Sequence, residues 1–159
     1  MTAAAGPDRL RQLARRAGRN HSRSRAAVAI LRADAAVARA LDRALGRAGL
    51  TLPQFNVLME LAAASDAAMP LYELNSRLVT SAPNMSWLST KMEQAGLVTK
   101  TRDASDARVV VLALTESAWA ALEVAVPLVS AVEAQLLQHL TVQELRTLAD
   151  LLGRLVTSD

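Results

Sequence analysis

The segment 70–115 constrains the possible fold more than any other part of this 159-residue chain. Residues 70–78 read PLYELNSRL and predict a helix, and residues 79–81 predict a turn after it. A second helix is predicted over 82–95, because Gly96 can adopt the left-handed conformation that ends a helix. The segments LVTKTRD and RVVVLALT then enclose the polar loop ASDA. This order predicts a helix-turn-helix followed by a β-hairpin wing.

The second predicted helix has one apolar face and one polar face. The apolar face carries Met85, Leu88 and Met92 at helical spacing. Ser81 is suited to cap the first turn, and Pro83 loses no hydrogen bond within that turn. The opposite face carries Pro83, Ser86, Trp87 and Thr90, and Asn84 and Lys91 lie on the flank. A helix of this kind fits the major groove of DNA.

Before the helix-turn-helix, a long helix is predicted over 22–48, because apolar side chains recur there every three or four positions. Residues 1–21 form a basic N-terminal arm, with one turn of helix at most. Thr51 and Gln54 have capping-box spacing for a further helix. A loop is expected over 65–69, so the strands are expected only in the wing.

Two more helices are expected after the wing, over 116–157. Thr115 is suited to cap the first, and a capping box opens the second at Thr141. The first is expected to bury a stripe of apolar side chains: Trp119, Leu122, Val126, Val129, Val132 and Leu136. The predicted fold class is therefore mainly α with a small β-hairpin wing, in a single domain over 22–159 whose winged helix-turn-helix region is 52–115.

The composition excludes several classes of function. The chain has no cysteine, which excludes disulfides, thiol redox sensing and cysteine-bound zinc. His21 and His139 are its only histidines, and no metal cluster, phosphate loop or nucleophile motif accompanies them. We therefore expect no cofactor, no metal and no enzymatic activity. No continuous apolar run reaches the ~18 residues of a membrane span, so a cytoplasmic protein without a membrane partner is expected.

Positive charge is concentrated at the N-terminus. Residues 1–25 hold seven arginines and one aspartate, whereas the net charge of the whole chain is only +3. A basic arm of this kind is suited to contact phosphate groups. It is equally typical of a solvated, frayed tail, and the sequence leaves both interpretations open.

The predicted terminal helices, 22–48 and 116–157, are apolar over more surface than the small module at 52–115 can cover. Pairing the ends of two chains would bury that surface, so a homodimer is expected with these helices as its interface. An intramolecular three-helix bundle is the alternative.

The chain resembles the MarR family of bacterial transcription regulators over residues 25–156. The resemblance depends on the order and spacing of short motifs rather than on any single one. These motifs are GLTLPQF at 49–55, EL at 73–74, SAPN at 81–84, MEQAGLV at 92–98, DASDAR at 103–108, LTE at 114–116 and LTVQE at 140–144.

The resemblance implies a homodimeric winged-helix repressor that binds a palindromic DNA operator and is released by a small aromatic, phenolic or anionic effector. Four positions depart from the family pattern: Trp87 stands at a common arginine position, Asn75 at an alanine, Ala107 at a basic residue and Pro70 at a threonine. The reading helix also has little positive charge. A winged-helix protein-interaction module, or a regulator that no ligand affects, therefore remains an alternative.

Within this resemblance, the helix at 82–95 is expected to read the major groove. Asn84 is suited to pair with adenine through two hydrogen bonds, and serine and lysine side chains are suited to phosphate oxygens. The expected DNA contacts of this helix are Ser81, Pro83, Asn84, Ser86, Trp87 and Lys91. Trp87 has two possible roles: contact with a thymine methyl or a sugar, or packing against Tyr72 or Arg77 as a structural plug.

The wing is expected to place Arg108 in the minor groove, where narrow A·T tracts concentrate negative potential. Asp106 is expected to orient the Arg108 guanidinium through a two-bond pair. Lys100 and Arg102 are expected to contact the flanking DNA backbone. The simpler alternative is a surface salt bridge between Asp106 and Arg108 that contributes little.

An effector pocket is expected between the long N-terminal helix, the helix that follows it and the DNA-reading region. Its candidate lining residues are Arg25, Asn56, Met59 and Trp119. Side chains at such positions often belong to the hydrophobic core instead, and that alternative stays open.

Overall fold

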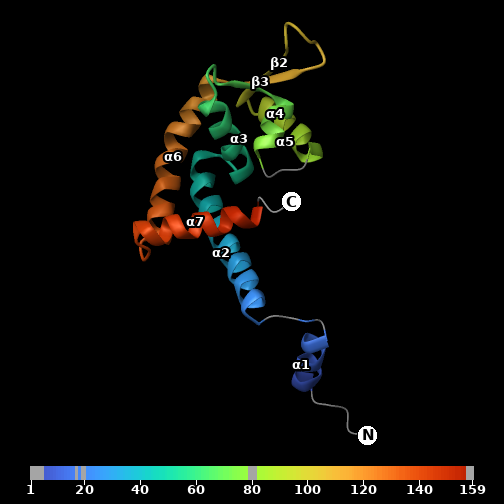
Figure 1. The fold of residues 1–159 in the computed structure, drawn as a ribbon. Coiled ribbons are helices and arrows are strands. Elements are labelled where there is room, and N and C mark those ends of the chain that lie inside the picture. The colour runs from blue at the N-terminus through green and yellow to red at the C-terminus, as the bar shows by residue number, and fades with distance from the viewer. Residues whose placement is uncertain (1–5, 17, 19–20, 79–81, 157–159) are drawn as a thin grey trace. The chain divides into compact units, whose positions relative to one another are not determined.

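The computed structural model describes residues 6–16, 18, 21–78 and 82–156 (Figure 1). Contacts divide the chain into two compact units, residues 1–39 and 40–159. The described part of the chain is mostly helical and contains a small three-stranded antiparallel sheet. This confirms the mainly α fold class with a winged helix-turn-helix.

The first unit contains α1 (Gly6–Arg16) and the N-terminal part of α2 (His21–Leu45). The sequence predicted one helical turn at most in this region, so the 11-residue helix α1 corrects that expectation. Pro7 lies in its first turn, where its missing N–H costs nothing. Arg15 and Arg16 lie in its last turn and complement the negative end of the helix dipole. Arginine is a good helix former, so a basic composition is compatible with helix.

The α-helix α2 ends at Leu45, three residues before the boundary predicted at 48. A 3₁₀ turn, η1 (Gly46–Ala48), follows the helix, and Gly49 then adopts a φ of 70°. Leu50 donates its N–H to the Leu45 carbonyl at 3.1 Å. Both leucines are buried in the core, so the chain turns back on the helix it has just left.

The predicted capping box opens α3 (Leu52–Ala63). The Thr51 N–H donates to Gln54 Oε1 at 2.9 Å, and the Gln54 N–H donates to Thr51 Oγ1 at 3.4 Å. The helix buries four apolar side chains: Phe55, Val57, Leu58 and Leu61. This face forms the centre of the hydrophobic core.

The helix-turn-helix consists of α4 (Leu71–Arg77) and α5 (Ala82–Gln94). The predicted turn between them, 79–81, lies outside the described residues. Gly96 has a φ of 71° and the Leu97 N–H donates to the Met92 carbonyl at 2.9 Å, so α5 ends at the predicted stop. The apolar face of α5 is buried as predicted: Met85, Leu88 and Met92.

Three antiparallel strands form one sheet with β3 in the middle. They are β1 (Ala68–Pro70), β2 (Val98–Arg102) and β3 (Val110–Leu114). The β2–β3 hairpin is the predicted wing and projects beyond α4 and α5 (Figure 1). The loop predicted over 65–69 is present at 65–67, but the prediction was wrong for Ala68 and Met69, which pair with Ala113 and Leu112 in a third strand. A strand of three residues has too few positions to show alternation and forms by pairing with β3.

Thr115 caps α6 (Glu116–Leu137) as predicted, with the Ala118 N–H donating to Thr115 Oγ1 at 3.2 Å. The same hydroxyl donates to the Gly96 carbonyl at 2.7 Å. One side chain therefore joins the end of α5 to the beginning of α6.

The buried face of α6 differs in part from the prediction. Leu122 and Val129 are buried as predicted, but their neighbours on that face are Ala118 and Ala125. Three residues of the predicted stripe remain 39–43% exposed: Trp119, Val126 and Leu136. The small alanine side chains let α6 approach α3 closely, which turns the buried stripe away from the larger side chains.

By length and composition alone, α6 is apolar enough to cross a membrane, which the sequence analysis did not expect. No other helix in the described ranges meets that test. One such helix is weak evidence of a membrane span. Only 17% of its apolar window is buried, so most of the apolar surface of α6 is exposed.

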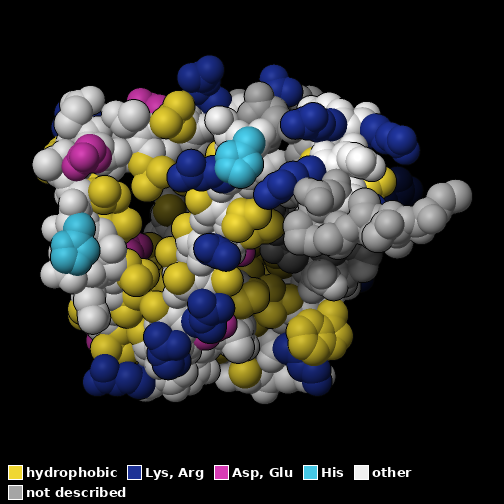
Figure 2. All heavy atoms as spheres, turned by 90° about the horizontal axis from the view of Figure 1, so that it is seen from below, with side chains coloured by type: hydrophobic (Ala, Val, Ile, Leu, Met, Phe, Trp, Pro, Cys, Tyr) yellow, Lys and Arg dark blue, Asp and Glu magenta, His cyan; other side chains and the backbone are white. Residues whose placement is uncertain are grey.

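The last helix, α7 (Val142–Val156), also begins with its predicted capping box. The Thr141 N–H and hydroxyl both donate to Glu144 Oε2 at 2.8 Å, and they hold the pKa of Glu144 below its usual value. None of the α7 residues is buried. Its exposed apolar side chains are Val142, Leu148, Leu151, Leu152, Leu155 and Val156. Figure 2 shows the protein from below, and hydrophobic side chains are exposed over much of the surface in this view.

Candidate nucleic-acid interface

The outward face of α5 is exposed and polar, as the sequence predicted. Four of the predicted contact residues have exposed side chains on this helix: Asn84, Ser86, Trp87 and Lys91. Pro83 lies in its first turn, and Ser81 lies outside the described residues. The buried side chains Met85, Leu88 and Met92 hold the opposite face against the core. The helix therefore presents its polar side chains to the outside.

Trp87 is 65% exposed, and Tyr72 is 69% exposed. This exposure does not fit the plug that the sequence left as one alternative, because a plug buries most of its indole ring. The indole ring therefore lies on the outward face of α5, and its contact with DNA stays a prediction.

Hydroxyl groups brace the backbone of α5 beneath this face. The Ser86 carbonyl accepts from Ser89 Oγ and from Thr90 Oγ1, each at 3.0 Å. Ser89 is fully buried, and the sequence analysis did not single it out. The sequence could have indicated this role, because helical spacing places Ser89 on the buried side of α5. A buried serine hydroxyl needs a hydrogen-bond partner.

Asp103 organises the wing loop, a role that the sequence analysis did not assign to it. Its Oδ1 accepts from the Ser105 hydroxyl, from the Ser105 N–H at 2.8 Å and from the Asp106 N–H at 3.1 Å. The Ser105 hydroxyl makes the largest contribution to lowering the pKa of Asp103, and the two backbone N–H groups add to it. An aspartate two residues before a serine is a typical Asx-turn signal.

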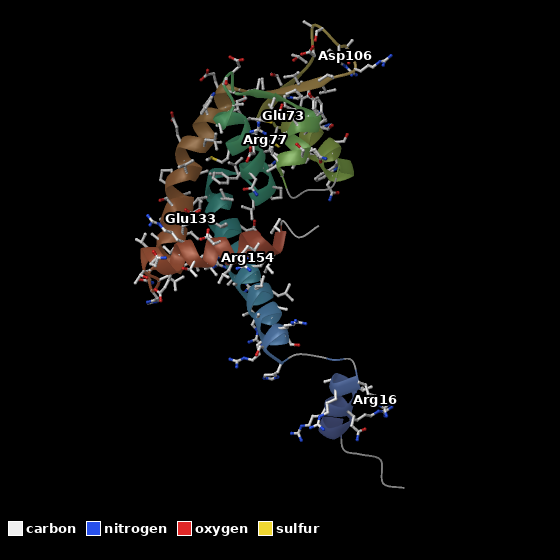
Figure 3. The ribbon with its side chains drawn as sticks, viewed as in Figure 1. Arg16, Glu73, Arg77, Asp106, Glu133 and Arg154 are labelled. Carbon is white, nitrogen blue, oxygen red and sulfur yellow. The ribbon has the colours of Figure 1, made fainter. Side chains whose placement is uncertain are left out.

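Asp106 does not make the predicted two-bond pair with Arg108. Its Oδ1 accepts from the backbone N–H of Arg108 at 2.9 Å, and no ion pair joins their side chains among the described residues. The prediction failed because the tight loop brings the carboxylate to the nearer backbone group. The Arg108 side chain is exposed on the wing, and Asp106 lies toward the end of the hairpin (Figure 3).

The two other cations expected on the wing have partners within the protein. The exposed Arg102 donates from Nη1 to the Ala107 carbonyl at 3.1 Å across the loop. Lys100 donates from Nζ to Thr90 Oγ1 at 2.8 Å, and its Nζ lies 3.6 Å from Glu93 Oε2. The sequence analysis gave neither Thr90 nor Glu93 this role. Strand β2 is therefore linked to α5 through a side chain.

An ion pair also links the helix-turn-helix to α3. Arg77 Nη2 lies 2.6 Å from Glu73 Oε1 on the same helix, and Arg77 Nη1 lies 3.8 Å from Glu60 Oε2 on α3. Figure 3 labels Glu73 and Arg77 on α4. All three side chains are partly exposed, so each pair contributes little stability by itself.

Asn75, one of the departures from the family pattern, lines a hollow of about 360 Å³ that Tyr72, Met85, Arg108 and Val110 also line. Within the described ranges, Asn75 Oδ1 is the buried side-chain oxygen or nitrogen that lacks a hydrogen-bond partner. An alanine at this position would leave no such oxygen.

The four candidate effector residues fall into both units. Arg25 belongs to the first unit and lines a hollow of about 880 Å³ there, together with Arg11, His21 and Arg32. In the second unit, Asn56 is exposed on α3, Met59 is 40% exposed on the same helix, and Trp119 is 39% exposed on α6. Their exposure speaks against the core alternative for these three side chains, and the shared pocket stays a prediction.

The MarR family model matches residues 50–110, which extend from the residue before Thr51 to the first residue of β3. No curated protein matches the chain. The matched range contains the helix-turn-helix and most of the wing.

Three solved structures illustrate the similarity. Sco3205, a MarR family transcriptional regulator from Streptomyces coelicolor in complex with DNA, has a TM-score of 0.81 at 20% identity, covering 86% of this chain and 87% of that chain. A mutant MarR from E. coli complexed with operator DNA has a TM-score of 0.75 at 25% identity, covering 81% and 91%. The organohalide-sensing transcriptional regulator RdhR in its 2,4-dichlorophenol-bound form has a TM-score of 0.78 at 25% identity, covering 86% and 80%.

The motifs, the fold and these similarities agree with one another. Each of these structures is similar over at least four-fifths of both chains. The chain therefore has a MarR-family winged helix-turn-helix at residues 50–110 within the fold of the MarR-family transcriptional regulators.

Proposed function

We propose that this protein is a cytoplasmic transcriptional repressor that binds a palindromic operator as a homodimer and releases it when a small aromatic or anionic ligand binds. The observation that carries the proposal is the exposed polar face of α5, with Trp87 65% exposed, beside a wing that ends in cationic side chains. A helix and a hairpin in this arrangement are suited to adjacent grooves of a duplex.

The residues of α5 have complementary roles in this proposal. Asn84 pairs with adenine in the major groove, while Ser86 and Lys91 contact phosphate oxygens. The indole of Trp87 packs on a thymine methyl group or a sugar. Ser81 and Pro83 complete the proposed contact set.

On the wing, Arg108 enters the minor groove and Arg102 contacts the backbone beside it. Asp106 contributes by shaping the loop, since its carboxylate binds the Arg108 N–H rather than the guanidinium. The guanidinium of Arg108 is therefore available to DNA without breaking an ion pair among the described residues.

The homodimer is supported by the apolar surface that α6 and α7 leave exposed. No residue of α7 is buried, although six of its apolar side chains lie at its surface. A soluble chain rarely exposes a continuous apolar helix face, and pairing with a second copy would cover it. Two α5 helices would then reach half-sites about one turn of DNA apart, ~34 Å.

We propose a small aromatic or anionic molecule as the ligand. RdhR, one of the similar proteins, is described in a 2,4-dichlorophenol-bound form. We propose Arg25, Asn56, Met59 and Trp119 as the residues that contact such a ligand, because three of them have exposed surface on α3 and α6.

A gel-shift assay with the DNA upstream of the protein's own gene tests the function. We expect a salt-sensitive shift, protection of an inverted repeat, and loss of the shift when a chlorinated phenol is added. A shift that the phenol leaves unchanged would contradict only the ligand step. Absence of a salt-sensitive shift on every promoter fragment would favour a protein-interaction module with a winged-helix fold.

A further inference from the structure

Lys100 lies on the middle residue of β2, opposite Leu112 of β3, yet its side chain reaches the reading helix. Its Nζ donates to Thr90 Oγ1 at 2.8 Å and lies 3.6 Å from Glu93 Oε2. The Lys100 side chain is only 20% exposed, whereas that of Glu93 is 43% exposed. The ammonium group is thus directed at α5, and most of the Lys100 side chain is covered.

The direction of these hydrogen bonds is fixed by their chemistry. An ammonium group has only donors, so Thr90 Oγ1 must accept from Lys100. The Thr90 hydroxyl then uses its own proton to donate to the Ser86 carbonyl at 3.0 Å. A continuous path of hydrogen bonds therefore joins the wing to the backbone just before Trp87, the exposed aromatic residue of α5.

The other contacts of α5 restrict rotation about its helix axis less than the hydrogen bond from Lys100 does. Met85, Leu88 and Met92 pack by dispersion and hydrophobic contact, which are not directional. The turn at Gly96 and Leu97 fixes only the C-terminal end of the helix. The bond from Lys100 to Thr90 is directional and lies about one turn before that end, so it limits how far the outward face can rotate.

We propose that Lys100 is a positioning residue: it sets the orientation of the α5 reading face relative to the wing rather than contacting a phosphate. This inference rests on the proposed binding of DNA. It replaces the backbone contact expected for Lys100 from the sequence, because the Nζ already has a hydroxyl and a carboxylate as partners.

The two roles predict different salt dependences. A lysine that contacts phosphate releases a counterion, and its removal lowers the slope of log K against log salt by about 0.9 per contact on every DNA sequence. A positioning lysine leaves this slope unchanged. Its removal instead reduces the ratio of specific to non-specific affinity, since the reading face no longer aligns with the bases.

The test compares Lys100→Met, which keeps most of the apolar stem, with Thr90→Val, which removes the accepting hydroxyl without changing the charge. We expect each variant to lose about tenfold in specific affinity, which is the effect of one charged hydrogen bond. The salt slope should not change. The double variant should lose no more than either single one, because both break the same path.

Two controls separate this effect from direct DNA contact. Thr90→Ser keeps the hydroxyl and should restore the specific affinity. Lys91→Met removes an exposed lysine whose Nζ contacts Gln94 at 3.2 Å within α5, and it should lower the salt slope. A Lys100→Met variant that behaves as Lys91→Met does, or a double variant whose losses add, would overturn the proposal.

A measurement on the free protein separates failure of this inference from failure of the proposed function. Lys100→Met should speed amide hydrogen exchange in α5 around Thr90 at least about threefold, and leave α3 unchanged. Unchanged exchange in α5 overturns the positioning role whether or not the protein binds DNA. Faster exchange in a protein that shifts no DNA supports the link between wing and helix while refuting the repressor.

Discussion

Arg108 is an exposed cation at the end of the wing with no ion pair among the described residues. Arg108→Ala should weaken operator binding and lower the salt slope by about one per subunit, because one phosphate or groove contact is lost. Gel shifts at several salt concentrations measure this. Arg47→Ala, an exposed arginine on η1, is the matched control. Equal slopes for Arg108→Ala and the wild type would remove Arg108 from the interface.

Replacing Asn75 by alanine, the residue common at this position in the family, should stabilise the protein. Its buried Oδ1 has no hydrogen-bond partner among the described residues, and asparagine is a poorer helix former than alanine. Asn75→Ala should therefore raise the free energy of unfolding by about 1 kcal/mol. Urea denaturation checks the sign. A variant less stable than the wild type would mean that Oδ1 has a partner, such as a bound water, that alanine cannot replace.

Asp103 gives the wing loop a predictable response to pH. Hydrogen bonds from Ser105 and Asp106 lower its pKa in the folded protein. Their contribution is thus fully present above the unfolded pKa of about 3.9 and is lost as the pH falls through the lower, folded value. The amide NMR signals of Ser105 and Asp106 should shift together in that acid range. Asp103→Asn should abolish this titration, and a titration that survives the substitution would assign it to another carboxylate.

At the scale of elements, the caps were the most accurate part of the prediction. Thr51, Thr115 and Thr141 each cap the helix that the sequence assigned to them. A cap depends on two or three neighbouring residues, so its signal is complete in the local sequence. The stops at Gly49 and Gly96 have the same local origin, and both glycines adopt a positive φ.

The errors concern features that depend on partners distant in sequence. Strand β1 forms because β3 lies beside it, and α6 turns Ala118 and Ala125 inward because α3 is there. In the wing, the charges of Asp106 and Arg108 suggested a salt bridge, but the loop geometry favours a backbone contact. The contact between Lys100 and Thr90 was not predicted, since the sequence cannot show that Thr90 lies within reach of Lys100.

The capping box of α3 supplies the prediction at this scale. Thr51→Ala removes the acceptor of the Gln54 N–H and should lower the free energy of unfolding by about 1 kcal/mol. The whole domain should respond, because α3 buries four side chains in the core. Thermal unfolding measures the change, with the exposed Ser130→Ala on α6 as the control. A loss no larger than that of the control would mean that the box is dispensable.

At the scale of the whole molecule, the exposed leucines of α7 decide whether two copies pair. Leu151→Asp and Leu155→Asp each place a charge on the apolar face, where burial would cost several kcal/mol. Either should weaken self-association by roughly a hundredfold or more. Sedimentation velocity at low micromolar concentration measures it. Arg146→Asp introduces the same side chain on the opposite side of α7 by helical spacing and should leave the dimer intact.

A folded wild-type monomer at every concentration would refute the dimer. It would favour the alternative in which the terminal helices pack within one chain. The DNA-reading face of α5 would then have to work as a single copy, and its operator would need no inverted repeat.

The Thr115 hydroxyl connects two helices, α5 and α6. It bonds to the Gly96 carbonyl at the end of α5 and accepts the Ala118 N–H at the beginning of α6. The 22 residues of α6 make a lever about 33 Å long. A displacement of only about 3 Å at the C-terminal end of α6 corresponds to a tilt of about 5° about its N-terminal end at Thr115. In the proposed homodimer, a tilt of this size would change the distance between the two α5 helices without a change inside either helix-turn-helix.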